Sequence, residues 1–206
     1  MESNWDQTAD IVIIGAGTAG LCAAIEARRL GNSVIILEKA REAEWRSSMS
    51  VIAGVLDFAG TKYQRAMGIE DSPEKYAEDG VKYCGGRPDL WKAFTDNHLS
   101  VLTMLEELNL PPSGVIGGWG HSVARCHTFQ GPQVLKVIED RAKELGSVIL
   151  WEHPAVELVA DRREGVLGAI AKTKAGEVSV RGLKGTMIAT GGFGRNLDLV
   201  KEVGPD

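Results

Sequence analysis

A glycine-rich turn between two apolar segments constrains the fold of this chain most strongly. Residues 11–14 form a short β-branched run, which is typical of a strand buried on both faces of a parallel sheet. The sequence Gly-Ala-Gly-Thr-Ala-Gly follows over residues 15–20 and opens an amphipathic helix over 18–30. A second apolar run, residues 34–37, ends at Glu38. Strand, helix and strand within about 30 residues predict a βαβ unit and an α/β fold.

The same turn predicts a dinucleotide site. A GxGxxG motif alone is only weakly informative, but here it follows a strand, opens a helix and is followed by Glu38 at the appropriate spacing. Gly15 permits a tight turn, Gly17 lets a pyrophosphate approach the backbone, and Gly20 lets the helix pack closely on the strand. Free N–H groups and the helix dipole then bind the anion, while Glu38 accepts hydrogen bonds from a ribose. A glycine-rich turn without a ligand is the alternative, and the coincidence of these features disfavours it.

Two later segments favour FAD over NAD as the dinucleotide. Small residues over 47–54 follow Glu38, where a flavin-binding loop would run along the cofactor. The apolar segment 187–190 runs into a glycine pair and could approach the pyrophosphate from another side. Short β segments between residues 148 and 190 predict an extra three-stranded layer stacked on the sheet, whereas NAD dehydrogenases usually continue with regular βα alternation. An NAD-dependent dehydrogenase is the weaker alternative.

Three segments together have the pattern of a known flavoprotein family. They are GAGTAG with Glu38, the serine-rich loop that ends at Gly54, and ATGGFGRN over residues 189–196. In these segments the chain resembles fumarate reductase, succinate dehydrogenase flavoprotein and 3-ketosteroid dehydrogenase. The resemblance implies a Rossmann-like βαβ FAD-binding domain with a mostly parallel sheet plus a small antiparallel β layer. It also implies hydride transfer between the flavin and an activated CH–CH or C=C bond, as in a fumarate-like acid or an enone.

The resemblance also implies which residues contact the cofactor. The turn wraps the pyrophosphate, Glu38 and its successors lie beside the adenosine ribose, and the serine loop follows the ribityl chain and flavin. One later residue meets adenine through its backbone, and a final group closes over the diphosphate. In that order the residues are Gly15, Ala16, Gly17, Thr18, Ala19, Gly20, Glu38, Lys39, Ala40, Ser47, Ser48, Ser50, Ala53, Gly54, Val156, Thr190, Gly191 and Gly192. No histidine lies in residues 40–60, so we expect non-covalent FAD.

The length predicts one domain, and the resemblance makes it an incomplete one. We expect the FAD-binding domain to occupy all 206 residues, without the capping domain and the second FAD segment that follow in the family. Because the cap carries the proton-donating residues, no catalytic residue is identified. The chain is therefore the N-terminal part of an oxidoreductase or, alternatively, a non-catalytic FAD- or ADP-binding module completed by a second chain. Glu44-Trp45 stands where family members usually carry a glycine pair.

Composition disfavours several other classes of protein. With 23 basic and 28 acidic residues the formal net charge is −5, which suits neither nucleic acid nor an anionic membrane. No apolar run approaches the ~20 residues that span a bilayer, and the polar N-terminus does not have the pattern of a signal peptide. The three cysteines have no metal or redox spacing, so we expect neither a metal site nor disulfides. A cytoplasmic protein acting on a small molecule is the expectation.

The remaining segments predict helices, loops and four histidines without catalytic roles. Helices are expected from Ser72-Pro73, over 88–108 and over 132–145, with loops over 47–60 and 114–120. The helix over 88–108 should bury Leu90, Phe94, Leu99, Leu102 and Leu105. The histidines are assigned to a solvated helix face (His98), to a loop ordered near the cofactor beside Arg125 (His121, His127) and to a turn before a strand (His153).

Overall fold

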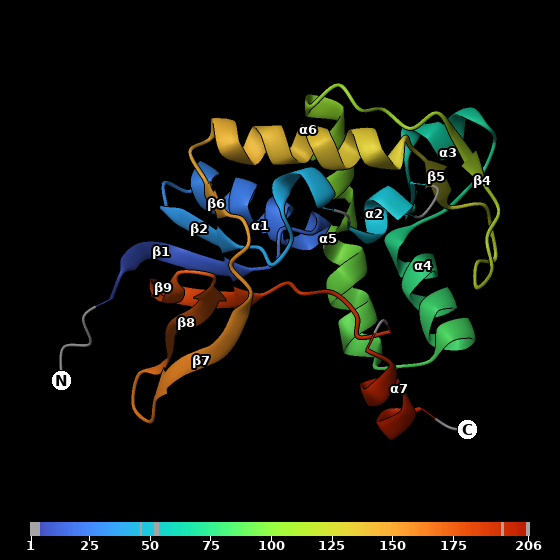
Figure 1. The fold of residues 1–206 in the computed structure, drawn as a ribbon. Helices are drawn as coiled ribbons and strands as arrows, with labels where there is room; N and C mark the ends of the chain where they lie inside the picture. Colours follow the sequence, from blue (N-terminus) through green and yellow to red (C-terminus); the bar gives the residue numbers. More distant parts are fainter. Residues whose placement is uncertain (1–4, 46, 52–53, 195, 205–206) are drawn as a thin grey trace. The chain divides into compact units, whose positions relative to one another are not determined.

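The predicted βαβ unit is present in the computed structural model (Figure 1). Strand β1 (Gln7–Ile14), helix α1 (Thr18–Arg29) and strand β2 (Val34–Leu37) follow one another, and the two strands pair in parallel. All of β2 and the end of β1 over residues 12–14 are buried, as expected for strands covered on both faces of a parallel sheet. The structure describes residues 5–45, 47–51, 54–194 and 196–204.

The chain forms two units. Unit 1 comprises residues 1–47 and 138–206, and unit 2 comprises residues 48–137. Unit 1 holds the predicted phosphate turn, and unit 2 holds most of the serine-rich loop.

Unit 1 is built on a six-stranded sheet with the order β6-β2-β1-β9-β8-β7. The neighbouring strands β6, β2, β1 and β9 pair in parallel, and β8 and β7 add an antiparallel edge. Buried apolar residues of four strands, β1, β2, β8 and β9, form a core against this sheet, among them Val12, Ile35, Ala169 and Val180. The strands not yet bounded are β6 (Val148–Leu150), β7 (Ala155–Asp161), β8 (Gly165–Thr173) and β9 (Gly176–Ile188). The predicted α/β fold with a mostly parallel sheet is confirmed.

Two predictions for this region need correction. Segments 178–180 and 187–190 are not separate strands, because β9 runs unbroken beside β1 from the pair Gln7–Val180 to the pair Ile14–Ile188. The β7–β9 hairpins also do not stack on the sheet as a separate layer. They continue the sheet, since β9 pairs with β1 on one side and with β8 on the other.

Unit 2 contains the second, smaller sheet. Strands β3 (Val55–Asp57) and β4 (Gly114–Ile116) both pair antiparallel with β5 (Cys126–Thr128). The predictions of loops over 47–60 and 114–120 are therefore wrong in part, since the first contains α2 (Ser48–Val51) and β3 and the second contains β4. Strands of three residues carry little local signal, and pairing with a distant strand determines them.

The predicted start of α4 and the predicted bounds of α5 and α6 agree closely with the structure. Ser72 caps α4 with its hydroxyl, Pro73 occupies the first helical position, and Gly146 follows the end of α6 with a φ of 89°. The elements not yet bounded are η1 (Glu42–Glu44), α3 (Lys62–Ala66), α4 (Pro73–Asp79), η2 (Gly80–Cys84), α5 (Pro88–Glu107), α6 (Gly131–Glu144) and α7 (Leu197–Val203). No helix among the described residues has an apolar stretch long enough to cross a membrane.

Helix α5 buries only part of the face predicted for it. Leu102 and Leu105 are buried and Leu99 is half-buried, but Leu90 and Phe94 are 59% and 47% exposed. His98 is buried rather than solvated, because its ring has two backbone partners. Its Nδ1–H donates to the Thr95 carbonyl at 2.6 Å, and its Nε2 accepts from the Ala59 N–H at 2.9 Å.

A buried ion cluster joins the helices of unit 2 to its sheet. The fully buried Arg125 guanidinium donates to both carboxylate oxygens of Asp71 at 2.7 Å and also pairs with Asp79. Burial alone would raise the pKa of Asp79, but hydrogen bonds from Ser122 and from Arg125 hold that pKa at about 2. Removing one member would leave a buried charge unpaired, which is strongly destabilising. Arg125 therefore has a structural role here.

His127 is buried in the same unit and is held as a neutral ring. Its Nδ1–H donates to the Arg125 carbonyl at 2.6 Å, and its Nε2 accepts from the Thr61 hydroxyl at 2.9 Å. Thr61 also begins α3 as half of a reciprocal capping box with Gln64. Burial lowers the pKa of His127 below its ordinary 6.5.

Acid should therefore destabilise the chain through His127. Because its folded-state pKa is lowered, the unfolded chain binds a proton over a pH range in which the folded chain does not. The free energy of unfolding should fall as the pH drops below about 6.5 toward the lowered pKa, and should be fully retained above that value. Urea denaturation between about pH 7.5 and 5 measures it, and His127→Gln should flatten the slope. Equal slopes in the wild type and the variant would contradict this assignment.

Candidate cofactor site

Two glycines of the turn over residues 15–20 are required by the backbone around them. Gly15 has a φ of 104°, and a Cβ on it would lie only 2.6 Å from the Ala189 carbonyl oxygen. A Cβ on Gly20 would overlap the Gly15 carbonyl oxygen and would also meet the side chain of Ile13. The first glycine thus permits the tight turn, and the third permits the close packing of helix on strand, as predicted.

Gly17 differs from both of these glycines. Its φ of −70° and ψ of 177° suit any residue, and no atom of the described chain lies within 4 Å of where its Cβ would be. The space beside this residue is therefore open. Packing does not explain a glycine here, whereas the approach of a ligand to the backbone does.

Helix α1 presents unpaired N–H groups at this open space. The N–H of Gly15 donates to the Leu37 carbonyl and that of Ala16 donates to Glu38, both at 2.8 Å. Among the hydrogen bonds of the described residues, none uses the N–H groups of residues 17–20. The first turn also carries no acidic side chain. Free donors and the positive end of the helix dipole therefore form a site for an anion such as a diphosphate.

Glu38 clamps this turn to the end of β2. Its nearly buried carboxylate accepts from the Ala16 N–H at 2.8 Å through Oε2 and from the Ala40 N–H at 2.9 Å through Oε1. The sequence analysis did not anticipate this role. Each oxygen of an ionised carboxylate has a second lone pair, so the arrangement fits a ribose hydroxyl as well. Lys39, between the two partners, is exposed.

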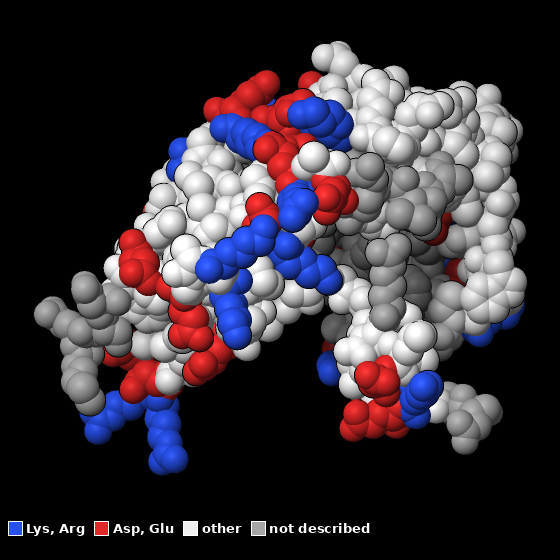
Figure 2. Space-filling model, in the orientation of Figure 1, with Lys and Arg blue, Asp and Glu red and all other residues white. Residues whose placement is uncertain are grey.

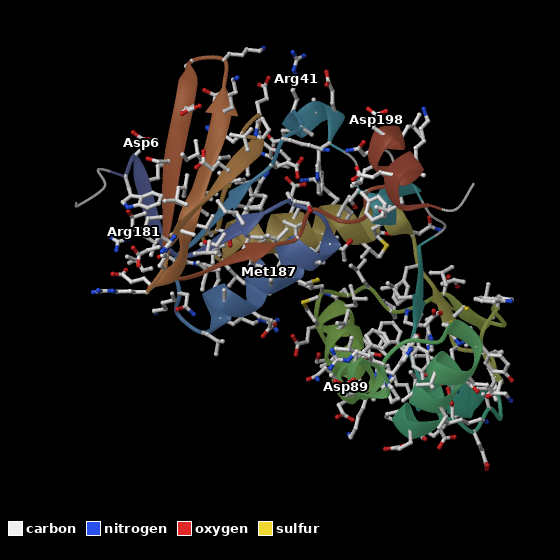
Figure 3. All side chains as sticks on the ribbon, turned by 90° about the horizontal axis from the view of Figure 1, so that it is seen from below. Asp6, Arg41, Asp89, Arg181, Met187 and Asp198 are labelled. Atoms are coloured by element: carbon white, nitrogen blue, oxygen red, sulfur yellow. The ribbon has the colours of Figure 1, made fainter. Side chains whose placement is uncertain are left out.

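Strand β9 brings the segment 189–192 to the turn. The Ala189 N–H donates to the Ile14 carbonyl at 2.8 Å, and Thr190 follows directly. Met187, labelled in Figure 3, marks the end of β9 that leads to the turn, while Asp6 and Arg181 mark the opposite end of the β1–β9 pair. Thr190 and both glycines after it are exposed. The structure therefore places this segment beside the turn, and its approach to the pyrophosphate stays a prediction.

The other predicted residues lie in several places. Val156 is 57% exposed in β7, and Ser47 is half-buried in unit 1. In unit 2, Ser48 is exposed in α2, whereas Gly54 is buried and its Cβ would lie 2.6 Å from the Gly131 nitrogen. Gly54 thus has a packing role, which its prediction as a flavin contact did not include. Ala53 lies outside the described residues, and only the backbone of Ser50 is described.

Two of the three thiols do not provide a nucleophile. Burial and the nearby Glu26 raise the pKa of Cys22 to about 11, and burial with Asp57 raises that of Cys126 to about 12. Both therefore remain protonated at neutral pH, in agreement with the predicted packing role of Cys22. All three cysteines are free.

The aspartates that neutralise the buried Arg125 of unit 2 were not predicted from the sequence. Asp71 and Asp79 lie 54 and 46 residues from Arg125, and no local pattern joins them. The capping box at Thr61 and Gln64 could have been found, because it follows the Thr-x-x-Gln pattern.

On the face shown in Figure 2, acidic and basic side chains of unit 1 are intermixed.

Comparison with known proteins agrees with this geometry. A family model described as the FAD binding domain matches residues 10–206. A probable fumarate reductase of Shewanella frigidimarina is 30% identical over 203 residues, which cover 94% of this chain and 34% of that protein. A flavocytochrome c3 fumarate reductase in its open conformation superposes with a TM-score of 0.88 at 27% identity, covering 97% of this chain and 36% of that one.

A steroid enzyme shares the fold. The 3-ketosteroid-Δ4-(5α)-dehydrogenase of Rhodococcus jostii RHA1 has a TM-score of 0.88 at 24% identity, with 98% of this chain and 50% of that one covered. The chain thus spans about a third of the length of the curated relative and at most half of these solved chains. The match over residues 10–206 sets the NAD alternative aside. The protein belongs to the FAD binding domain family, and its cofactor is FAD.

Proposed function

We propose that this chain is the FAD-holding part of an oxidoreductase that exchanges hydride with an activated carbon–carbon bond. The substrate class is a small molecule with a polarised C=C or CH–CH bond, such as a fumarate-like acid or an enone. The observation that carries the proposal is the open phosphate turn of α1 with Glu38 and the end of β9 beside it. The similarity to fumarate reductases and to a ketosteroid dehydrogenase supports the substrate class.

In this proposal the chain's own residues bind and orient the cofactor. The N–H groups of residues 17–20 hold the diphosphate, and the Glu38 carboxylate fixes the turn while accepting a ribose hydroxyl. The exposed segment 190–192 closes over the diphosphate from the side of β9. The bound flavin supplies the hydride chemistry, which the protein only positions and tunes.

The remaining expected contacts belong to the same proposal. We place the ribityl chain and flavin along the serine-rich loop and the adenine at the backbone of β7, and we propose that units 1 and 2 form one non-covalent FAD-binding domain. The residues concerned are Lys39, Ser47, Ser48, Ser50, Ala53, Gly54 and Val156. A cytoplasmic location and completion of the site by a second chain stay predictions.

Neither Arg125 nor His127 is proposed as the proton donor. Arg125 is fully buried and paired with two aspartates, and the Nε2 of His127 is occupied by the Thr61 hydroxyl. A proton donor must reach the substrate carbon, whereas the proton-bearing atoms of both residues are buried and already paired within the chain. In this proposal Arg125 and His127 therefore have structural roles only.

Reoxidation of the reduced flavin tests the reaction class. The full chain is loaded with FAD, reduced under anaerobic conditions and mixed with fumarate, with an enone steroid or with urocanate. We expect at least one of these acceptors to restore the oxidised flavin spectrum faster than it does with free reduced FAD. If the chain binds FAD but none of the acceptors accelerates reoxidation, the result supports the alternative of a non-catalytic FAD- or ADP-binding module or of a subunit completed by a second chain.

Gly17→Val should abolish FAD binding without unfolding the chain. The new side chain fits the existing backbone angles and open space but blocks the approach to the N–H groups of α1. We expect an affinity loss on the order of 100-fold or more, with a stability change below about 1 kcal/mol. Fluorescence titration with FAD and urea denaturation measure the two quantities.

Gly117→Val is the matched control for this substitution. Gly117 also has open space around its Cβ position and does not adopt a positive φ, but it belongs to unit 2 and is not part of the turn. Its affinity for FAD should equal that of the wild type. Unchanged affinity in Gly17→Val would show that the turn is not the binding site.

Glu38→Ala should weaken both stability and FAD binding. It leaves the Ala16 and Ala40 N–H groups without their acceptor and removes the ribose contact. We expect a loss of roughly 1–3 kcal/mol in the free energy of unfolding and a similar loss in binding. Glu44→Ala, at an exposed position in η1, is the control and should change neither quantity. An unaltered stability in Glu38→Ala would contradict the clamp.

A further inference from the structure

We propose that Asp57, His121 and Cys126 form a binding site for a divalent transition-metal ion of the zinc type. The three side chains belong to unit 2, and they come from β3, from the loop between β4 and β5, and from the start of β5. One ligand atom from each residue lies within 4.8 Å of the other two. A thiolate, an imidazole and a carboxylate together form a donor set that zinc accepts. The proposal is independent of the FAD site.

The register of the small sheet brings two of the three ligands together. Asp57 and Cys126 are directly opposite partners on antiparallel strands, so their side chains project to the same face. His121 adds its ring to this face, with its Nε2 3.4 Å from Asp57 Oδ2 and only 10% of its side chain exposed. Two ligands at ~2.1 Å from a tetrahedral zinc ion are separated by roughly 3.4 Å. The His121–Asp57 spacing therefore already matches that of two ligands on one ion.

Two further observations indicate that the cluster is arranged for a ligand. Although 32% of the Asp57 side chain is exposed, its Oδ1 atom is shielded from solvent and, beside the Cys126 thiol, has no hydrogen bond of ordinary geometry among the described residues. A buried unpaired carboxylate oxygen is costly, and a cation would satisfy it. In addition, a Cβ on Gly118 would overlap the Cys126 sulfur and lie 3.2 Å from the His121 ring. The glycine therefore leaves room for the thiol and the imidazole.

The charges around the cluster balance a divalent ion. Ionised Asp57 and a Cys126 thiolate carry two negative charges, and the thiol proton passes to solvent as the metal–sulfur bond forms. The positive charge of the neighbouring Arg125 is already neutralised by its two aspartates. When His121 binds the ion through Nε2, its imidazole proton must be on Nδ1. The long hydrogen bond of 3.5 Å that Nδ1 accepts from Arg125 is then lost.

The coordination that results is an open one. Three protein ligands leave a fourth position for water, as zinc sites with a free position do. The ion would tie the loop between β4 and β5 to the small sheet. The ligands come from separate segments of the sequence without a recognised metal spacing, which explains why the spacing of the cysteines predicted no metal site.

Titration of the metal-free full chain with Co²⁺ tests the proposal. We expect a sulfur-to-cobalt charge-transfer band in the near ultraviolet, visible bands of tetrahedral intensity, saturation at one ion per chain, and displacement by Zn²⁺. Cys126→Ser should remove the charge-transfer band, and Asp57→Asn should weaken binding at least tenfold. Cys22→Ser, in α1, should leave the spectrum unchanged. Absence of the band, or its survival in Cys126→Ser, would overturn the proposal.

Thermal unfolding provides a second readout that does not depend on the spectrum. Saturating Zn²⁺ should raise the unfolding midpoint of the wild-type chain and should not raise that of Asp57→Asn. Because asparagine has nearly the shape of aspartate, the variant should fold without metal, which circular dichroism checks. An equal effect of Zn²⁺ on both chains would show that the cluster is only an ion pair of His121 and Asp57 beside a packed thiol.

Discussion

The unpaired N–H groups at the start of α1 are the feature on which the cofactor site depends. Three features keep them in position. They are the positive φ of Gly15, the close packing at Gly20, and the hydrogen bond from the Ala16 N–H to the Glu38 carboxylate. None of the three blocks the open side of the turn at Gly17. The site is thus rigid where the backbone supports it and open where an anion approaches, which is the preorganisation that anion binding by amides needs.

Unit 2 is stabilised in a different way, through polar groups that are buried and fully engaged. Arg125 connects a helix-bearing segment to β5 through two aspartates, while His98 and His127 each bind backbone or hydroxyl partners on both ring nitrogens. Such groups are costly to bury alone, so their partners must fold together with them. Asp57 is the exception, because one of its buried oxygens has no such partner among the described residues.

Sequence was informative where the signal is local and uninformative where it is not. The β1–α1–β2 unit, the starts of α4 and α5 and the hairpins after residue 148 follow from apolar periodicity, caps and turns. The small sheet, the buried face of α5 and the partners of Arg125 depend on contacts between distant segments. Within the site, the backbone at Gly15 and Gly20 agrees with the roles predicted for these two glycines, and the predicted cofactor contacts stay predictions. The clamp by Glu38 was not predicted, since a hydrogen bond from its carboxylate to the backbone of the turn is not part of the motif.

The central claim is that the amides of residues 17–20 bind the diphosphate of the cofactor. An NMR titration of the ¹⁵N-labelled chain with ADP, compared with adenosine, tests it most directly. We predict that the amide signals of these four residues shift together with ADP, saturate at one common dissociation constant, and stay nearly unchanged with adenosine. If ADP binds while these amide signals remain in place, the account is contradicted.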